Sequence, residues 1–185
     1  MKYSIFMSHA VIAIIVTILC GLIYATVQHS HRSGANDPQL QMARDISSAI
    51  QKNSNAENLL PKDTVEIAES LSPFVVFYNN NGEPVQSNGL LDGSLPEMPQ
   101  GVFDFARKNK ENVLTWQPRK GVRMAMVIES VPSPGIAFVA AGRSLKVVEK
   151  RVGDLIEILF IGWLICIAVI IVHGAIVSFS KKGLI

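Results

Sequence analysis

The chain of 185 residues contains only two cysteines, Cys20 and Cys166, and both lie inside long apolar runs. The segment between these runs has no cysteine, which excludes a disulfide bond and a thiolate metal site within it. Its only histidines are His29 and His31, and nothing near them completes a set of metal ligands. We therefore expect no metal and no cofactor in this segment, and interpret the two histidines as part of a polar stretch.

Motifs of nucleotide-binding and hydrolytic enzymes are also missing. The sequence has no Gly-rich phosphate loop, no His-Glu-x-x-His helix, no Gly-x-Ser-x-Gly turn and no Cys-x-x-Cys pair. Its 17 Lys+Arg stand against 15 Asp+Glu, and no basic stripe typical of nucleic-acid binding is present. We therefore expect no enzyme activity and no nucleic-acid partner; a membrane hydrolase would need a nucleophile and a base that the sequence does not bring together.

Two long apolar runs, residues 5–27 and 158–179, dominate the sequence instead. Each exceeds the roughly 20 residues that an α-helix needs to cross the hydrocarbon core of a bilayer. The residues between them are polar and charged, and they suffice for one compact domain. We predict four parts: residues 1–28 with a first membrane helix, 29–153 as one domain outside the cytoplasm, 154–180 with a second membrane helix, and 181–185 as a cytoplasmic tail.

Basic residues near the ends of the runs indicate the orientation. Lys2 precedes the first run, Lys181 and Lys182 follow the second, and such residues tend to stay in the cytoplasm. Arg32, just after the first run, is a weaker signal in the opposite direction. The lipid bilayer is thus the first expected partner: the chain crosses the plasma or bacterial inner membrane twice, with both termini inside.

A cleaved signal peptide is the alternative interpretation of the first run. Its apolar stretch is longer than the usual core of a signal peptide, and no small-x-small cleavage site stands out near its end. Leu19, directly before Cys20, is too bulky for lipoprotein processing. An uncleaved membrane anchor therefore fits the sequence better.

The domain is expected to open with a polar linker at residues 30–36. A helix should follow, because Asp37 suits an N-cap, Pro38 suits the first helical position, and apolar residues then recur at steps of three and four to Ile50. This helix is expected to end near residues 52–55. A second, shorter helix is predicted at residues 64–71, with Asp63 as its cap.

After Pro73 the sequence changes to runs of β-branched and aromatic residues, which favour strands. Strands are expected at residues 74–78, 84–87, 113–117, 122–131 and 136–142, with a helix at 102–110. Short turns between the last three strands predict an antiparallel meander. The predicted fold class is α+β, a five-stranded antiparallel sheet with flanking helices.

This order resembles the PAS-like sensor domains, called PDC or Cache domains, that bacterial receptors hold outside the membrane. Residues 63–78 look like a helix entering the first core strand, residues 81–85 like the following hairpin, and residues 142–151 like the exit toward the membrane helix of a sensor histidine kinase. We expect no kinase module after the second run. The resemblance implies signal transduction by a module that binds a ligand or partner and has no catalytic output of its own.

Such a module would act through a second copy, forming a homodimer, or through a partner histidine kinase or another membrane protein. The alternative is a structural or accessory membrane subunit that uses the PAS-like fold as a scaffold. The two differ in whether the fold holds a ligand or only its own side chains.

In PAS-like domains, small ligands bind between the concave face of the sheet and the adjoining helices and loops. The candidate lining residues here are Tyr78, Trp116, Met124 and Met126, with Arg119 and Arg123 available for an anion. The same apolar residues also suit an ordinary core. Arg123 alternates with the two methionines, so it is solvated if they form the core and faces the pocket if they do not.

The helix entering the second run has two further features. A seam with coiled-coil spacing is formed by Leu145, Val148, Val152 and Leu155, which either transmits a signal between helices or packs against the chain's own domain. Glu157 and His173 are ionisable residues within the second membrane segment, where such residues are uncommon and often functional. Both lie near an end of the segment, where polar side chains are also tolerated.

Overall fold

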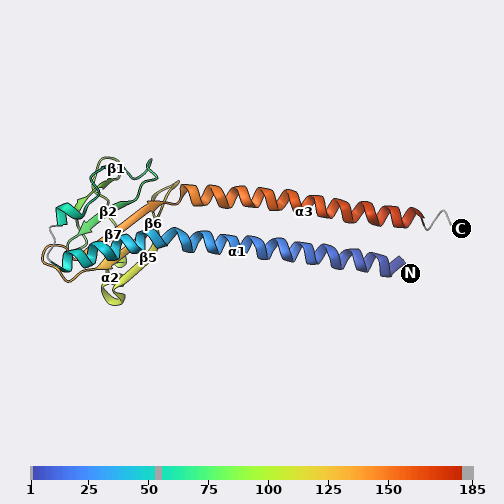
Figure 1. The fold of residues 1–185 in the computed structure, drawn as a ribbon, viewed down its shortest axis with the longest axis horizontal. Helices are drawn as coiled ribbons and strands as arrows, with labels where there is room; N and C mark the ends of the chain where they lie inside the picture. The colour runs from blue at the N-terminus through green and yellow to red at the C-terminus, as the bar shows by residue number, and fades with distance from the viewer. Residues whose placement is uncertain (1, 53–55, 181–185) are drawn as a thin grey trace. The chain divides into compact units, whose positions relative to one another are not determined.

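The computed structural model describes residues 2–52 and 56–180 of the chain (Figure 1). The chain divides into two compact units, one made of Met1–His31 with Lys150–Ile185 and the other of Arg32–Glu149. The predicted tail, residues 181–185, lies outside the described residues.

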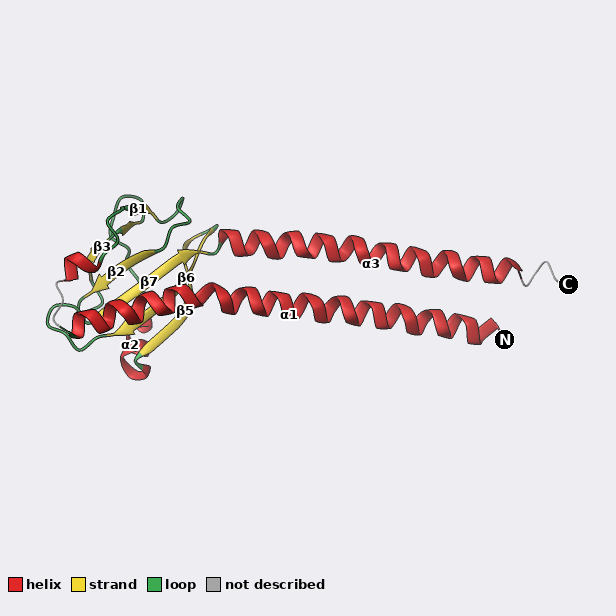
Figure 2. Ribbon diagram, in the orientation of Figure 1, coloured by secondary structure: helices red, strands yellow, loops and turns green. Residues whose placement is uncertain are grey.

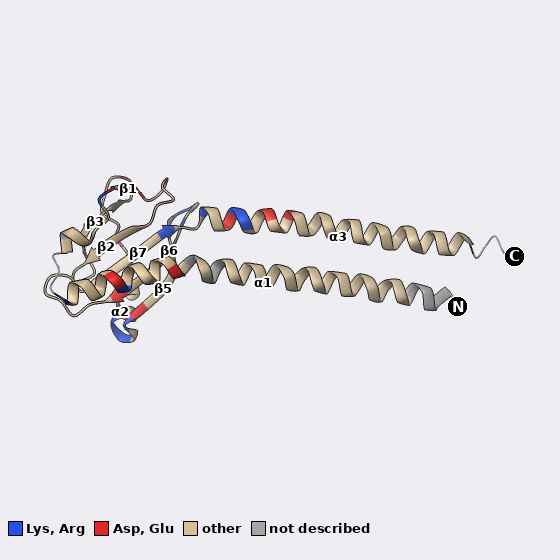
Figure 3. Cartoon of the chain, in the orientation of Figure 1, with Lys and Arg blue, Asp and Glu red and all other residues tan. Residues whose placement is uncertain are grey.

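Two helices are long and apolar enough to cross a membrane (Figure 2). Helix α1 spans Lys2–Gln51 and helix α3 spans Lys146–Ser180. No described residue of α3 is buried, and apolar side chains such as Ile158 and Phe179 are 67% and 73% exposed. Charged residues are confined to the first turns of α3, up to Glu157, and the rest of that helix has none up to Ser180 (Figure 3). Water would penalise such a surface, whereas the hydrocarbon of a bilayer would not.

The expected linker at residues 30–36 is wrong, because α1 continues through it without a break and holds Pro38 in its interior. A proline inside a helix costs roughly 3 kcal/mol through its missing N–H and its clash with the preceding turn. Ile46 and Ile50, both buried against the sheet, each contribute about 1.5–3 kcal/mol. Burial of the last turns of α1 therefore offsets the proline.

Five strands form one antiparallel sheet in the order β3-β2-β7-β6-β5. They are β2 (Phe74–Tyr78), β3 (Pro84–Ser87), β5 (Glu111–Arg119), β6 (Val122–Ser130) and β7 (Phe138–Ser144). The last three pair as the predicted meander, and β2 joins β7 with Phe74 opposite Gly142. The α+β fold with a five-stranded antiparallel sheet and flanking helices is therefore confirmed.

Helices cover both faces of this sheet. On one face α2 (Gln100–Asn109) adds Phe103 and Ala106 to the larger core, and on the other the end of α1 adds Ala43, Ile46 and Ile50. Strand β2 is accordingly buried along its whole length, as its unbroken apolar sequence predicts.

Close packing at the centre of the sheet requires a glycine. A Cβ atom added at Gly142 would clash with Met126 Sδ on β6 and with the ring of Phe74 on β2. Because both neighbours are themselves fully packed, a larger residue here would force the sheet to shift.

The second predicted helix, residues 64–71, is also wrong. Val65–Glu66 instead forms a short strand, β1, parallel to β4 (Gly89–Leu90). The Glu66 carboxylate accepts the backbone N–H groups of Ala68, Asp92 and Gly93 at 3.1–3.4 Å. These bonds tie the segment to a distant loop, which a local helical pattern does not reveal.

Strand β5 runs past Pro118, where the sequence predicts its end. Proline lacks the N–H that a ladder needs, but β5 is an edge strand and pairs only with β6. A register shift between Trp116 and Arg119 accommodates it. The short 3₁₀ helix Ala56–Leu59 completes the described elements.

Candidate functional site

The four apolar pocket candidates lie together inside the larger core. Tyr78, Trp116, Met124 and Met126 are 0%, 7%, 1% and 0% exposed and pack in the same cluster as Phe103. The rings of Tyr78 and Phe103 are 4.8 Å apart between centroids, in a tilted arrangement. These side chains fill the face on which a ligand was expected.

Tyr78 uses its hydroxyl inside this core. The hydroxyl donates a hydrogen bond of 2.9 Å to the carbonyl oxygen of Pro96 in the loop before α2. Burial raises the pKa of Tyr78 above its ordinary value, so the phenol stays protonated and keeps donating. Its role is to hold that loop against the sheet.

The two arginine candidates lie elsewhere, and each is paired. Arg119 binds both carboxylate oxygens of Asp92 at 2.9 and 3.0 Å, with its side chain half exposed. Arg123 forms an ion pair with Glu149 in the first turn of α3. Since Met124 and Met126 belong to the core, Arg123 projects from the opposite face, as their alternation along β6 requires.

An open cavity of about 630 Å³ lies at another place on the domain, beside Arg107 and Lys110 of the α2 end. Its other lining residues come from the end of α1, the β2–β3 turn, and the β6–β7 hairpin (the end of β6, the connection and the start of β7): Gln51, Asn80, Glu129, Ser130, Val131, Pro132, Ala137 and Phe138. The volume falls within the range of small-molecule sites.

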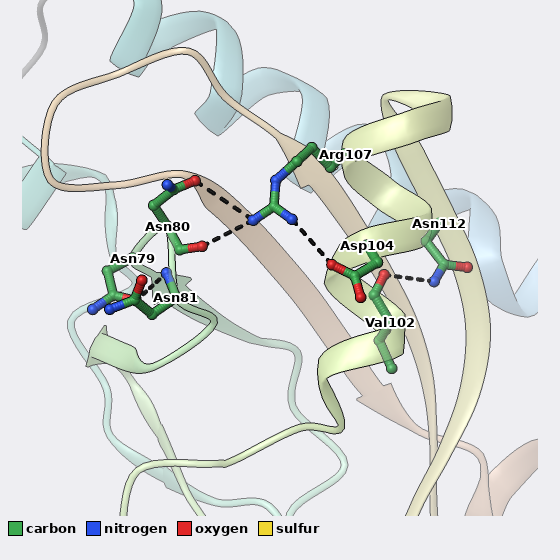
Figure 4. A network of polar contacts seen from close by, with 7 residues as sticks. All are labelled: Asn79, Asn80, Asn81, Val102, Asp104, Arg107 and Asn112. Atoms are coloured by element: carbon green, nitrogen blue, oxygen red, sulfur yellow. Dashed lines mark hydrogen bonds and ion pairs between the residues drawn. The ribbon is translucent and has the colours of Figure 1, made fainter.

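Arg107 makes several contacts at the wall of this cavity. Figure 4 shows it reaching from α2 to the β2–β3 turn, where it donates to the Asn80 carbonyl oxygen at 2.9 Å, and it also pairs with Asp104 at 3.0 Å. Its guanidinium carbon lies 5.2 Å from the centroid of the Phe138 ring, a cation–π distance. The arginine thus joins α2, the turn and β7, which explains its position without a ligand.

Glu129, on the α1 side of the same cavity, has an unusual carboxylate. Its Oε2 atom is buried and has no hydrogen-bond partner among the described residues. Burial raises the pKa of Glu129; the Ser47 hydroxyl beside it and Arg44 oppose the rise, and Glu111 adds to it. The Ser47 hydroxyl lies close by but lacks the geometry of a full hydrogen bond.

The seam residues are divided between the two units. Leu145 is 9% exposed and Val148 is half-buried, and both belong to the unit of the sheet, whereas Val152 and Leu155 belong to the other unit. The Ser144 hydroxyl accepts the Lys146 N–H at 3.3 Å, so it caps the start of α3.

Of the two ionisable residues in the second membrane segment, Glu157 is exposed along α3, and His173 makes a specific contact. His173 Nδ1 lies 3.0 Å from Nε2 of His9 on α1. A second contact joins the same helices, because Trp163 Nε1 donates to Thr17 Oγ1 at 2.9 Å. His9 was not among the residues predicted from the sequence. The signal that could have identified it is that His9 is an ionisable residue in the first apolar run, at a depth similar to that of His173 in the second.

Comparison with known proteins gives no family for this chain. No protein-family model matches it, and no curated protein matches it significantly.

Proposed function

We propose that the protein is a membrane-anchored, sensor-like module that binds a ligand or partner outside the cytoplasm. In this proposal α1 and α3 cross the cell membrane, both termini lie in the cytoplasm, and the sheet is a PAS-like domain of the PDC or Cache type. The module has no catalytic output and acts through another membrane protein or a second copy.

The observation that supports this most is the direct connection from the sheet to α3. Only Leu145 separates β7 from α3, and its N–H donates to the Arg123 carbonyl oxygen of β6 at 2.9 Å. The Arg123 side chain also pairs with Glu149 one turn into α3. A shift of β6 or β7 would therefore move the first turn of α3, which is the motion that a sensor domain has to produce.

The cavity beside Arg107 is the place we assign to a ligand, because the Tyr78–Met126 face is filled. Lys110, Ser130 and Glu129 supply a cation, a hydroxyl and a carboxylate around a partly apolar wall. Ser130 and Glu129 are the last residues of β6, so a ligand there would act on the strand that holds α3.

Photo-crosslinking in intact membranes tests the proposal. A crosslinking residue at Ile165 or Val172 of α3, both strongly exposed, should capture another membrane protein or a second copy. The matched control is the same residue at Lys120, in the exposed turn between β5 and β6. Recovery of monomer alone from the helix sites under every condition tried would contradict action through a partner.

The filled core favours a second candidate function, an accessory subunit that uses the fold as a scaffold. Thermal unfolding of the full chain in detergent, against a small-molecule library, separates the two. A sensor should be stabilised by at least one compound, and Ala137→Leu, which narrows the cavity, should abolish that effect while Thr115→Leu on the exposed edge should not. If the protein is a scaffold, no compound should raise the unfolding temperature of the unsubstituted protein or of either variant.

A further inference from the structure

Glu129 lies on the face of the sheet that the end of α1 covers. Side chains alternate along β6, so Glu129 shares a face with Val127 and Val131 on either side of it in the sequence. These two valines pack in the same clusters as Ala43 and Ile46 of α1. An ionisable side chain is therefore part of an otherwise apolar contact between helix and sheet.

A second carboxylate lies directly beside Glu129. Glu111 of β5 is its register partner in the antiparallel ladder, so both side chains project from the same face at neighbouring positions. Arg44 of α1 serves Glu111, whose Oε2 atom accepts from the guanidinium at 3.1 Å. Among the described residues Glu129 has no ion pair. Like charges directly opposite each other on neighbouring strands destabilise a sheet, so two ionised carboxylates share one arginine here.

The α1 side of the contact gives Glu129 no strong partner. Glu129 Oε2 and Ser47 Oγ are both buried, and neither has a hydrogen-bond partner in the described part of the chain. Ser47 is 1% exposed, and its hydroxyl is the polar group of α1 beside the carboxylate. Burial without a strong partner disfavours the ionised form of a carboxylic acid.

We propose that the contact between the end of α1 and the sheet is strengthened by acid, because protonation of Glu129 holds α1 more tightly on β6. The added proton removes the charge of Glu129, and with it the repulsion from Glu111 and the cost of burying an ion. The neutral carboxyl also gains an O–H group that can donate to the Ser47 oxygen. Loss of the proton restores an uncompensated negative charge within the contact.

The balance of forces on Glu129 agrees with this direction. Burial is the largest cause of its raised pKa and Glu111 adds to it, whereas Ser47 and Arg44 oppose it. Since the pKa is higher in the packed state, the stabilisation is complete below the ordinary glutamate pKa of about 4.3. It is lost as pH rises through the pKa of the folded protein.

The remaining neighbours of Glu129 do not replace the missing partner. Its register partner on β7 is Val139, which carries no charge. Arg107 and Lys110 line the cavity on its open side, but Arg107 is paired with Asp104. Lys110 is exposed, where water and salt screen its charge.

This contact acts on a different helix from the Arg123–Glu149 pair. Helix α1 is unbroken from Lys2 to Gln51, so its last turns belong to the same helix as the first apolar run. In the proposed function α3 carries a change in the sheet, and the Glu129 contact adds a pH-dependent connection through α1. It needs no ligand in the cavity, so it stands or falls separately from ligand binding.

Hydrogen exchange of the full chain in lipid nanodiscs tests the proposal. Exchange rates of backbone amides, divided by those of an unstructured chain at the same pH, are compared for residues 43–51 of α1 and for α2. Lowering the pH from 7.5 to 4.5 should slow exchange in residues 43–51 about three-fold or more relative to α2. Glu129→Gln should give slow exchange at both pH values. Glu97→Gln, which removes an exposed carboxylate from the loop before α2, should keep the response.

Glu111→Gln tests the role of the neighbouring carboxylate. With Glu111 neutral and Arg44 free to approach Glu129, the response should move to lower pH. Three results would each overturn the proposal: an equal change in α1 and α2 of the unsubstituted protein, a response that persists in Glu129→Gln, or a response that Glu111→Gln leaves at the same pH. The first of these does not depend on any variant folding.

Discussion

Arg123 of β6 forms an ion pair with Glu149 of α3, and its backbone carbonyl accepts the N–H of Leu145 between β7 and α3. One residue thus holds the start of α3 by both its side chain and its main chain. In the proposed function this is where a change in the sheet reaches a membrane helix.

Charge reversal tests the side-chain part of this contact. The two side chains are 39% and 44% exposed, so Glu149→Arg should lower the free energy of unfolding by only about 0.2–1 kcal/mol. The exchanged pair, Arg123→Glu with Glu149→Arg, should recover most of that loss. The free energy of unfolding is measured in detergent for the unsubstituted protein, Arg123→Glu, Glu149→Arg and the double variant. If the losses of the two single variants simply add in the double variant, the ion pair contributes nothing to stability.

Replacing Gln39 with an apolar residue should stabilise the folded protein. It is 0% exposed on α1, and neither atom of its side-chain amide has a hydrogen-bond partner among the described residues. Gln39→Leu should therefore raise the free energy of unfolding, on the order of 1–3 kcal/mol. Gln41→Leu is the matched control, because Gln41 is exposed and bonds Asp45, and it should give no gain. A loss of stability in Gln39→Leu would mean that the amide has a partner, such as a buried water.

Because of Glu129, the domain should be more stable at acidic pH than at neutral pH. Its pKa is raised in the folded state, so the folded protein binds the proton more tightly than the unfolded chain, whose glutamate has a pKa of about 4.3. The stability it contributes is full below that value and is lost as pH rises through the folded pKa.

Glu129→Gln removes this dependence. The variant should unfold at a higher temperature than the unsubstituted protein at pH 7, and the difference should vanish near pH 4. Melting curves of the full chain across that range measure it. A variant that is less stable at pH 7 would show that the ionised carboxylate is well paired.

The Trp163–Thr17 hydrogen bond should contribute modestly to pairing of the apolar helices. Measured values for such bonds within membranes average about 0.6 kcal/mol and reach about 1.7 kcal/mol. Trp163→Phe and Thr17→Val should each lose that amount, and the double variant no more than either alone. Additive losses in a double-mutant cycle would show that the two side chains do not interact.

Most of the sheet could be predicted from sequence because its signals are local. The unbroken apolar run of β2 follows from its burial on both faces, and β6 is likewise buried on both faces from Met124 to Ile128. The sequence left open whether Met124 and Trp116 belong to a core or line a pocket, and the structure places both in the packed cluster. Whether any of the six pocket candidates contacts a ligand stays a prediction.

The parts that sequence did not predict depend on distant contacts. Residues 64–71 have a helical pattern, but Glu66 is fixed by backbone groups of a loop that follows β4. Pro38 would end an isolated helix, yet the sheet buries the turns after it. The cavity beside Arg107 is lined by four segments that are separate in the sequence. His9 and His173 are in contact although 164 positions separate them in the sequence. Neither feature can be predicted from a local sequence pattern.

Topology mapping tests the central claim, that one sheet domain is held outside the cytoplasm by two membrane-crossing helices. Fusions of a fluorescent protein and of alkaline phosphatase to each terminus would be combined with a single cysteine, Lys120→Cys, in a chain carrying Cys20→Ala and Cys166→Ala. We predict that both termini give fluorescence without phosphatase activity, and that Lys120→Cys reacts with an impermeant maleimide in intact cells. Termini on opposite sides of the membrane, or a cysteine that reacts only after lysis, would contradict the account.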